Sequence, residues 1–428
     1  MENTIENKVA QSGLIQLDLE TIRIPGERIF FDIKPLLFMD MVLKEKDFRA
    51  FLADHPWNQY QGKHVAISCS SDAIIPTWAF MLISAQMSPF ASTIVYGNLE
   101  ELEKELSIYT KCPNTITCAN GTDAIFIALL GLGIGPGDEV IVPEVTWVAT
   151  ASAVRYVGAT PIFADIDPAT WCIDPESARQ KITSKTKAIM PVHLYGFAAD
   201  MNAITALAKE HNLYIVEDAA PAIGTLIDGK PAGSFGEFGA YSFQGAKMLV
   251  TGEGGMLVTS DPELYERARK IQDHGRKPGT FWIEELGYKY KMNNVTAALG
   301  LAQLERSENQ INQKRRIAGW YQELLGGHDA LKMQFESTGT RSIHWMNSVT
   351  LDDSLNITRD EVMEKLKADG IDTRPVFPAI SQYPIWDKVH VPGPVATQVG
   401  ANSINLPSGV KLSKKSIERV CQSLVNLI

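Results

Sequence analysis

Short apolar runs alternate with amphipathic segments along the middle of this chain. Six β-branched or aromatic runs are predicted as strands: residues 139–143, 160–164, 188–192, 214–216, 240–243 and 256–259. Between them, apolar residues at helical spacing predict helices at 147–157, 200–210 and 262–272. Strands that alternate with helices build parallel sheets from βαβ units. The pattern therefore predicts an α/β protein with a mostly parallel sheet.

A long helical pattern separates this region from the end of the chain. Residues 295–325 carry an apolar stripe on one side and charged or amide side chains on the other, which is typical of an amphipathic helix. Beyond it the chain predicts a strand over 345–351, a helix over 359–368 opened by Thr358, a strand leading to Arg374 and a last helix from Ser413. This order favours a smaller α+β domain.

The first hundred residues follow a different pattern. They predict a strand at 30–32 and a charged helix that contains residues 44–47. Residues 73–99 carry no charge, but they include prolines and many polar side chains, so we expect a buried helix plus a strand and no membrane contact. The chain thus divides into three predicted parts: an atypical N-terminal segment (1–100), a large domain (101–325) and a small C-terminal domain (326–428).

Composition narrows the class of protein. The 428 residues leave room for two or three domains, and 45% hydrophobic with 21% charged residues is typical of a globular chain. A net charge of −10 at pH 7 repels phosphate polyanions, so we expect no nucleic-acid partner. Five cysteines without close-paired metal-ligand spacing, and no signal-peptide pattern at the start, favour a reducing cytoplasm and no metal site.

Two charged residues are candidates for chemistry. Lys247 is the single lysine of a tight turn between the strand at 240–243 and a glycine-rich turn, where rigid backbone would hold it at an open end of the sheet. The alternative is a solvated surface lysine. Asp218 follows the strand at 214–216, and α/β sheets place functional residues beyond the carboxyl ends of their strands. The alternative for Asp218 is a helix cap or a turn acid.

A predicted helix start and a tryptophan are two further candidates for chemistry. Gly121 and Thr122 open a predicted helix after Asn120, and free amides at a helix start favour a phosphate. Ordinary capping by Asn120 explains this pattern equally well. Trp147 follows a predicted strand and supplies a flat aromatic side chain; the alternative is that this side chain only packs in the core. A lysine, a strand-end aspartate, a helix-start phosphate site and a flat aromatic side chain together form the set needed to hold pyridoxal phosphate.

Seven ordered motifs connect these residues to a known family. They are NGTDAIFIAL from Asn120, GDEVIVPEVTWVATASAV from Gly137, KAIMPVHLYG from Lys187, VEDAAPAIGT from Val216, FGAYSFQGAKMLVTGEGGM from Phe238, GYKYKMNNVTAALGLAQLER from Gly287 and TRPVFP from Thr373. From about Leu102 to its end, the chain resembles the DegT/DnrJ/StrS sugar aminotransferases. The resemblance implies the aspartate-aminotransferase-like fold, PLP fold type I. HWMNSV at His344, TRPVFP and INLPSG at Ile404 are most similar to perosamine-synthase-type members.

The resemblance implies a role for each candidate residue. Lys247 would attach pyridoxal 5'-phosphate covalently and move the substrate proton, and Asp218 would pair with the ring nitrogen. The remaining cofactor contacts would be phosphate binding by Gly121, Thr122 and Ser242, and ring stacking by Trp147. The resemblance also implies that the amino group moves from glutamate to a nucleotide-linked keto sugar, and that the enzyme is a homodimer.

Two positions depart from the family pattern, and two others have open roles. Pro221 stands where relatives carry Gln, Glu or His, and it cannot supply a side-chain hydrogen bond. Lys289 replaces an asparagine that reaches the neighbouring subunit's cofactor phosphate; a lysine can still meet a phosphate as a point charge, and a surface lysine is the alternative. His193 is either a packed core residue or a substrate contact, and Arg374 binds either a substrate anion or an internal acid.

The N-terminal hundred residues lie outside this resemblance. They resemble the opening half of a small bacterial protein family of unknown function, through GERIFFDIK at Gly26, LKEKDFRAF at Leu43, WNQYQGKHVAISCSSDAIIPTWAFML at Trp57 and VYGNLEELE at Val95. This assigns no chemistry. The replaced N-terminus and Pro221 keep open a non-catalytic, cofactor-binding regulatory or scaffold protein. A pyridoxamine-dependent sugar dehydratase is disfavoured, because such relatives carry histidine in place of the lysine and Lys247 is present.

Overall fold

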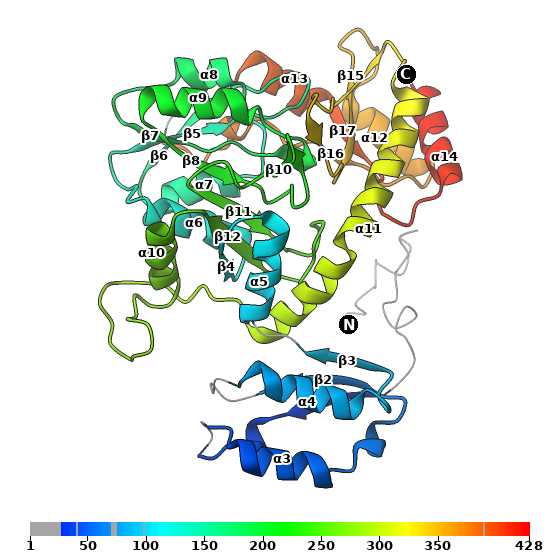
Figure 1. Ribbon diagram of the computed structural model, residues 1–428. Coiled ribbons are helices and arrows are strands. Elements are labelled where there is room, and N and C mark those ends of the chain that lie inside the picture. Colours follow the sequence, from blue (N-terminus) through cyan, green and yellow to red (C-terminus); the bar gives the residue numbers. More distant parts are fainter. Residues whose placement is uncertain (1–26, 40–41, 70–74, 97–98, 388–389) are drawn as a thin grey trace, which may run out of the picture. The chain divides into compact units, whose positions relative to one another are not determined.

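The computed structural model describes residues 27–39, 42–69, 75–96, 99–387 and 390–428 of the chain (Figure 1). The chain divides into two compact units, Met1–Asn98 and Leu99–Ile428. The second unit contains every residue that the sequence nominates for chemistry. Each unit has its own hydrophobic core, so each can be described by itself.

The N-terminal unit is a small parallel sheet with helices. Its elements are β1 (Arg28–Asp32), η1 (Lys34–Leu36), α3 (Glu45–Asp54), η2 (Trp57–Tyr60), β2 (His64–Ser68), α4 (Thr77–Met87) and β3 (Thr93–Tyr96). The strands are parallel and lie in the order β1-β2-β3. The strand predicted at 30–32 is confirmed, as are the charged helix and the helix plus strand within the uncharged stretch.

A seven-stranded sheet forms the centre of the second unit. Its strands are β4 (Asn114–Cys118), β5 (Glu139–Pro143), β6 (Thr160–Ala164), β7 (Thr186–Ile189), β8 (Tyr214–Asp218), β11 (Phe238–Ser242) and β12 (Gly255–Thr259), in the order β4-β12-β11-β8-β7-β5-β6. β12 runs antiparallel to both neighbours, and the other pairings are parallel. The predicted α/β class with a mostly parallel sheet is therefore confirmed.

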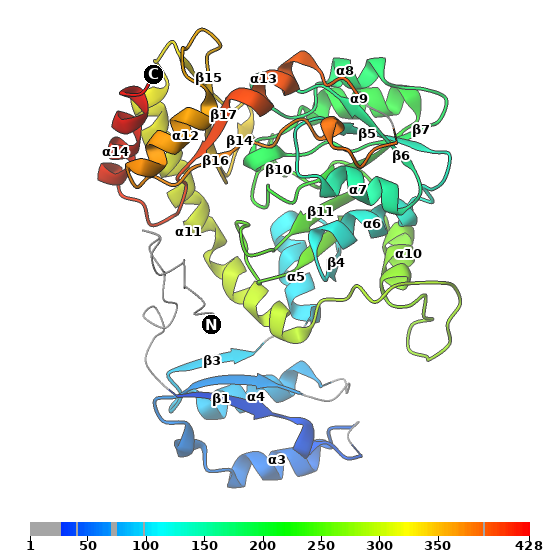
Figure 2. The same ribbon diagram turned by 180° about the vertical axis from the view of Figure 1, so that it is seen from behind.

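Helices cover both faces of this sheet (Figures 1 and 2). They are α5 (Leu99–Thr110), α6 (Gly121–Gly131), α7 (Ala149–Tyr156), α8 (Pro175–Gln180), α9 (Met201–His211) and α10 (Pro262–Gln272). Side chains alternate along a strand, and β5 shows the result. Val140 and Val142 lie in the core beneath α6, α7 and α10. Ile141 lies in the core on the other face, beneath α5, α8 and α9. Apolar residues on both sides of a strand explain why these strands read as continuous hydrophobic runs.

The long helix α11 (Asn294–Leu325) runs from α5 to the C-terminal part of the second unit. There, β13 (Leu331–Met333), β15 (Asn347–Leu351), β16 (Arg374–Pro375) and β17 (Ser403–Leu406) form a sheet in the order β13-β15-β17-β16. The remaining elements are β9 (Leu226–Ile227), β10 (Lys230–Pro231), β14 (Thr340–Arg341), η3 (Leu194–Gly196), α12 (Arg359–Ala368), η4 (Ile380–Gln382), α13 (Pro394–Asn402) and α14 (Lys414–Val425). α11, α12 and α14 share a third core with this sheet, as the predicted α+β pattern requires.

Helix caps explain where the predicted boundaries are accurate. Thr358 and Glu361 form a complete capping box, so α12 starts where the sequence places it. The strand predicted at 188–192 instead ends at Ile189, because Pro191 has no amide hydrogen to continue the ladder. The helix predicted from Trp147 begins at Ala149, two residues later.

Candidate active site

The candidate residues lie at one edge of the seven-stranded sheet. β8 ends at Asp218 and β11 ends at Ser242, and parallel strands bring their carboxyl ends to the same edge. β4 is also parallel to these strands and ends at Cys118, just before α6. β12 runs the other way, so it begins at this edge with Gly255, which pairs with Ser242 on one side and Cys118 on the other.

Glycine allows the first turn of α6 to approach the sheet closely. A Cβ atom on Gly121 would lie 2.8 Å from the Ser242 Cβ, and one on Gly255 would lie 2.4 Å from the Asn120 carbonyl group. The Asn120 side chain accepts a 2.9 Å hydrogen bond from the Asp123 amide, so the predicted capping is confirmed. This bond uses only the Asp123 amide, so the Gly121 and Thr122 amides still have no intrahelical partner. Capping and phosphate binding are thus compatible, because they use different amides of the same helix start.

Two adjacent carboxylates at the end of β8 have different surroundings. Glu217 is completely buried and accepts hydrogen bonds from His193 Nε2 at 3.0 Å and from the amides of Gly233, Phe235 and Gly236 at 2.5–2.8 Å. Successive side chains of a strand point to opposite faces. Asp218 therefore faces the other side, where it lies close enough to Lys247 for electrostatic attraction.

Thr150 is a site residue that the sequence reasoning missed. Its hydroxyl donates a 2.7 Å hydrogen bond to Asp218 Oδ2, and the Ala220 amide donates to Asp218 Oδ1 at 3.1 Å. Burial raises the pKa of Asp218, and the two hydrogen bonds and Lys247 oppose this rise. The available signal was spacing, since Thr150 follows Trp147 by three residues in a segment that predicted a helix.

Lys247 is not a solvated surface lysine. Burial lowers the pKa of its amine, and the carboxylate of Asp218 opposes this change. The amine nitrogen lies 4.3 Å from the ring centroid of Trp345, a distance typical of a cation–π contact. Trp345 is the second missed residue: it lies in the HWMNSV motif, but a motif alone does not say which side chain it meets.

Trp147 is not a core residue either. Its side chain is 59% exposed, and its ring lies 5.8 Å from that of Phe377. Trp147 lies three residues before Thr150, whose hydroxyl holds Asp218, and a large, exposed aromatic ring is suited to cover a flat ligand. The core-packing alternative for Trp147 is therefore wrong.

The other candidates lie in quite different environments. His193 is fully buried, and both of its ring nitrogens have partners, Glu217 and the Ala199 amide, which favours the packing role. Arg374 pairs with Asp372 at 2.6 Å, and both side chains are largely exposed. Lys289 is exposed and its backbone bridges to Asp273, while Pro221 is buried in the turn after β8.

These residues fit pyridoxal 5'-phosphate. The close approach of Gly121 to Ser242 leaves backbone amides and a hydroxyl at a helix start, which is the donor set that a phosphate requires. Asp218 is a buried carboxylate suited to hold a positive ring nitrogen, and Lys247 is a partly buried amine within electrostatic reach of it. Trp147 offers the flat surface for the ring. The site therefore defines a pyridoxal-phosphate enzyme of the α/β class.

Comparisons with known proteins identify the family. Residues 86–425 match the DegT/DnrJ/EryC1/StrS aminotransferase family, so the chain belongs to this family of aminotransferases, which depend on pyridoxal 5'-phosphate. It is 42% identical to a GDP-perosamine synthase of Caulobacter vibrioides over 76% of this chain and 88% of that protein. It is 38% identical to a UDP-N-acetyl-3-dehydro-alpha-D-glucosamine 3-aminotransferase of Acidithiobacillus ferrooxidans, over 77% of this chain and 88% of that protein.

Solved structures support the same fold. The crystal structure of a family member from Brucella abortus matches 76% of this chain and 89% of its own, with 32% identity and a TM-score of 0.71. Residues 3–127 also match a family described as a protein of unknown function (DUF2480), which confirms the second resemblance. Across the part of the chain that the structure describes, no helix has the length and apolar character needed to cross a membrane.

Proposed function

We propose that this enzyme transfers an amino group from glutamate to a nucleotide-linked keto sugar, and that its substrate is a 4-keto-6-deoxyhexose of the perosamine type. The observation that carries the proposal is the 42% identity to a GDP-perosamine synthase over 328 residues that include Lys247 and Asp218. The 3-aminotransferase at 38% identity supports the wider class of sugar nucleotides. The intact lysine and aspartate do not favour the scaffold alternative.

Each residue of the site has a proposed task in this reaction. Bound pyridoxal 5'-phosphate supplies an electron sink for the negative charge that develops at the substrate carbon. Lys247 Nζ would take a proton from that carbon and deliver it to C4′ of the cofactor, which requires a neutral amine; burial favours this form. Asp218 holds the proton of the ring nitrogen, and Thr150 keeps the Asp218 carboxylate oriented. The Gly121 and Thr122 amides and the Ser242 hydroxyl bind the phosphate.

A turnover screen tests the substrate. Purified enzyme with glutamate would be offered GDP-, UDP- and dTDP-linked sugars with the ketone at C3 or C4, and amino-sugar products would be detected by mass spectrometry. We expect the highest kcat/KM with a GDP-linked 4-keto-6-deoxyhexose. Turnover of 3-keto sugars alone would contradict the perosamine-type substrate. No product from any sugar, combined with no change in the cofactor spectrum on adding glutamate, would contradict the aminotransferase proposal itself.

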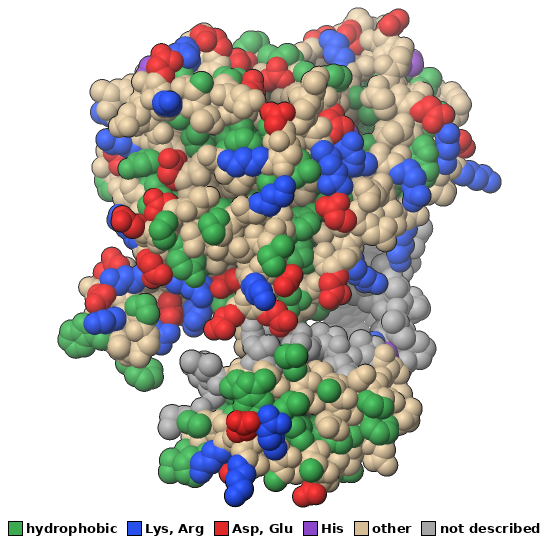
Figure 3. Space-filling model, viewed as in Figure 1, with side chains coloured by type: hydrophobic (Ala, Val, Ile, Leu, Met, Phe, Trp, Pro, Cys, Tyr) green, Lys and Arg blue, Asp and Glu red, His purple; other side chains and the backbone are tan. Residues whose placement is uncertain are grey.

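We also propose that the enzyme is a homodimer in which the loop between α10 and α11 meets a second copy. Phe281, Trp282 and Leu286 of this loop are 95%, 70% and 88% exposed, and a cluster of exposed apolar side chains is typical of an interface. The loop extends from the second unit near α10 in Figure 1, and hydrophobic side chains lie at its outer end in Figure 3. Lys289, on the returning part of the loop, would then contact the partner's cofactor phosphate.

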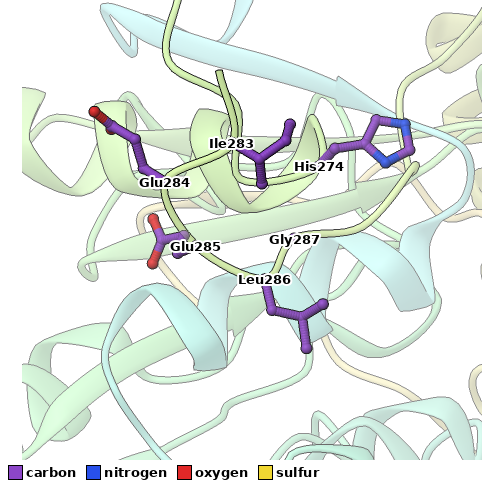
Figure 4. A pocket seen from close by; sticks show the side chains of 6 residues that line it. All are labelled: His274, Ile283, Glu284, Glu285, Leu286 and Gly287. Carbon is purple, nitrogen blue, oxygen red and sulfur yellow. The ribbon is translucent and has the colours of Figure 1, made fainter. Parts of the chain in front are cut away.

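The loop is an ordered structure of its own, which suits a binding role. The Lys277 amide donates to the Trp282 carbonyl at 2.9 Å, and the Glu284 amide donates to the Gly275 carbonyl at 2.9 Å. Lys270 of α10 pairs with Glu284 at 2.6 Å. Figure 4 shows six residues, from His274 to Gly287, that line a hollow of about 570 Å³ in this loop, and none of the candidate site residues is among them.

Sedimentation and cofactor titration test this arrangement. A variant with Phe281→Asp and Trp282→Asp should sediment as a monomer, because charge on the apolar loop opposes burial. Lys289→Ala should remain dimeric but bind the cofactor more weakly, and Lys277→Ala in the same loop is its control. A wild-type monomer, or unchanged cofactor affinity in Lys289→Ala, would contradict the proposal. We also propose a cytoplasmic location, because an odd number of cysteines in a large chain suits a reducing compartment.

A further inference from the structure

Four aromatic side chains form a continuous wall from the ring-stacking tryptophan to the catalytic lysine. Trp147 lies 5.8 Å from Phe377, Phe377 lies 5.7 Å from Tyr195, and Tyr195 lies 5.8 Å from Trp345, measured between ring centroids. The Trp345 ring then faces the Lys247 amine at 4.3 Å. These residues come from four separate segments of the chain, so the wall exists only in the folded protein.

Trp345 is the most firmly held member of this wall. Its indole Nε1 donates a 2.8 Å hydrogen bond to the carbonyl of Ala246, the residue that precedes Lys247. Its own amide donates to the Tyr195 carbonyl at 2.9 Å. Trp345 thus contacts both the side chain of Lys247 and the backbone that carries it. A side chain that fixes its neighbour at two points limits the directions in which the amine can move.

The third polar group of Trp345 is its backbone carbonyl, and Lys314 of α11 binds this carbonyl. The Lys314 amine donates a 2.7 Å hydrogen bond to the Trp345 carbonyl, and the Lys314 side chain is only 8% exposed. Burial lowers the pKa of Lys314 to about 8. A buried lysine is costly unless it makes a useful interaction, and the only hydrogen bond that the described residues give its amine goes to Trp345.

We propose that Trp345 is the positioning residue of Lys247, and that Lys314 anchors it from α11. The indole ring orients the Lys247 amine and stabilises its ammonium form, whereas the indole N–H fixes the turn that presents the lysine. Asp218 is the other charged group that acts on this amine, from the end of β8. The inference rests on the proposed role of Lys247 and adds the residue that determines where its amine lies.

Two substitutions separate the ring from its N–H group. Trp345→Phe keeps an aromatic ring but loses the bond to Ala246, and Trp345→Leu loses both. The pKa of Lys247 would be measured in the apoprotein, by trace acetylation across a pH series and mass spectrometry of the Lys247 peptide. We expect the labelling midpoint to fall by about half a pH unit or more in Trp345→Leu and to change less in Trp345→Phe. This readout needs no sugar substrate, so it is independent of the turnover screen.

Kinetics of the loaded enzyme provide the second readout. In both variants we expect kcat to fall about ten-fold or more with little change in the KM for glutamate, because misplacement of the amine affects the proton transfer. Lys314→Met should lower kcat in the same direction by less. Trp320→Leu is the matched control: Trp320 also faces a cation, Arg316 at 5.6 Å, but it packs in the core shared by α11, α12 and α14.

The outcomes are decisive once folding is verified by circular dichroism and thermal unfolding. A folded Trp345→Leu variant with an unchanged labelling midpoint and unchanged kcat would overturn the proposal. An equal shift in Trp320→Leu would also overturn it, since the effect would then be a general result of losing an aromatic residue. If Trp345→Leu does not fold, the Phe and Lys314→Met variants provide the same comparison.

Discussion

The two compact units of this chain are both built on parallel strands, yet they use polar residues differently. In the N-terminal unit, His55 and Tyr60 form a 2.9 Å hydrogen bond inside a cluster of aromatic rings that includes Phe31 and Trp57. In the second unit, Asp218 is buried at the end of β8 and Lys247 is partly buried in the turn after β11, and burial raises the pKa of Asp218 and lowers that of Lys247. The first arrangement stabilises a core, and the second favours the uncharged forms of the two groups that we propose for the reaction.

The difference shows what a parallel sheet needs to become a reactive site. Strand ends alone are insufficient: the site of the second unit also needs the Thr150 hydroxyl, the glycine contact between α6 and β11, and Trp345 from the C-terminal part. Each group comes from a different element around the same edge. The match to a family of unknown function assigns no comparable set to the N-terminal unit.

The largest expected effect comes from removing the reactive amine. Lys247→Ala should lower kcat by more than about 1,000-fold, because the group that we propose to transfer the proton is lost. Steady-state assays with glutamate and the best keto sugar would measure the change. Lys209→Ala, at an exposed position in α9, should leave kcat unchanged. Normal turnover by Lys247→Ala would show that the strand-end pair is not the reactive group.

A smaller effect is expected from the hydroxyl that supports the aspartate. Thr150→Val keeps the shape of the side chain but removes its hydrogen bond to Asp218, so kcat should fall about ten-fold. The pH dependence of the cofactor spectrum would report the altered charge at Asp218. Thr150→Ser restores the hydroxyl and should recover most of the activity. Equal kcat values for the Val and Ser variants would argue against the hydrogen bond.

Glu336 is a carboxylate away from the strand ends, and its substitution tests a contribution to stability rather than to chemistry. Burial opposes ionisation of Glu336, but hydrogen bonds from His344, Arg315 and the Ser342 amide lower its pKa to about 2. A lowered pKa stabilises the fold fully above the unfolded-state value of about 4.5, and this contribution is lost as pH falls from there toward about 2. Glu336→Gln should therefore lower the free energy of unfolding by about 2 kcal/mol at pH 7 and by clearly less at pH 3.

Urea unfolding at the two pH values measures this contribution. The control is Glu210→Gln, because Glu210 forms an exposed pair with Arg179 at 2.9 Å. Exposed pairs contribute little, so this variant should change the unfolding free energy by less than about 0.5 kcal/mol at either pH. A loss in Glu336→Gln that is the same at pH 3 and pH 7 would contradict the assigned pKa.

The smallest effect on catalysis is expected from removing the whole N-terminal unit. A chain that starts at Leu99 keeps α5 and the complete second unit, so kcat/KM should change by about three-fold or less. Kinetics and gel filtration of the shortened chain would test this. A loss greater than ten-fold would show that the N-terminal unit completes the substrate site, and the contrast between the two units would then be wrong.

Much of the fold was predictable from local pattern. β5, β6, α10 and α12 have the boundaries that periodicity and caps predict, because apolar spacing and N-cap residues act within a few residues of sequence. Less local features were not predicted as well. β7 ends early at a proline, and Trp147, which the pattern also allowed as a core residue, is exposed.

The sequence by itself determined the elements, the family and the types of reactive group: a lysine in a turn, a carboxylate after a strand and glycines at a helix start. Only the tertiary structure decided which groups meet. It turned Asp218 toward Lys247 and Glu217 toward His193, and it brought Thr150 and Trp345 to residues 68 and 98 positions away in the chain. The physical reason is that pattern and capping are local, whereas contact between side chains depends on strand order, register and the packing of helices onto the sheet.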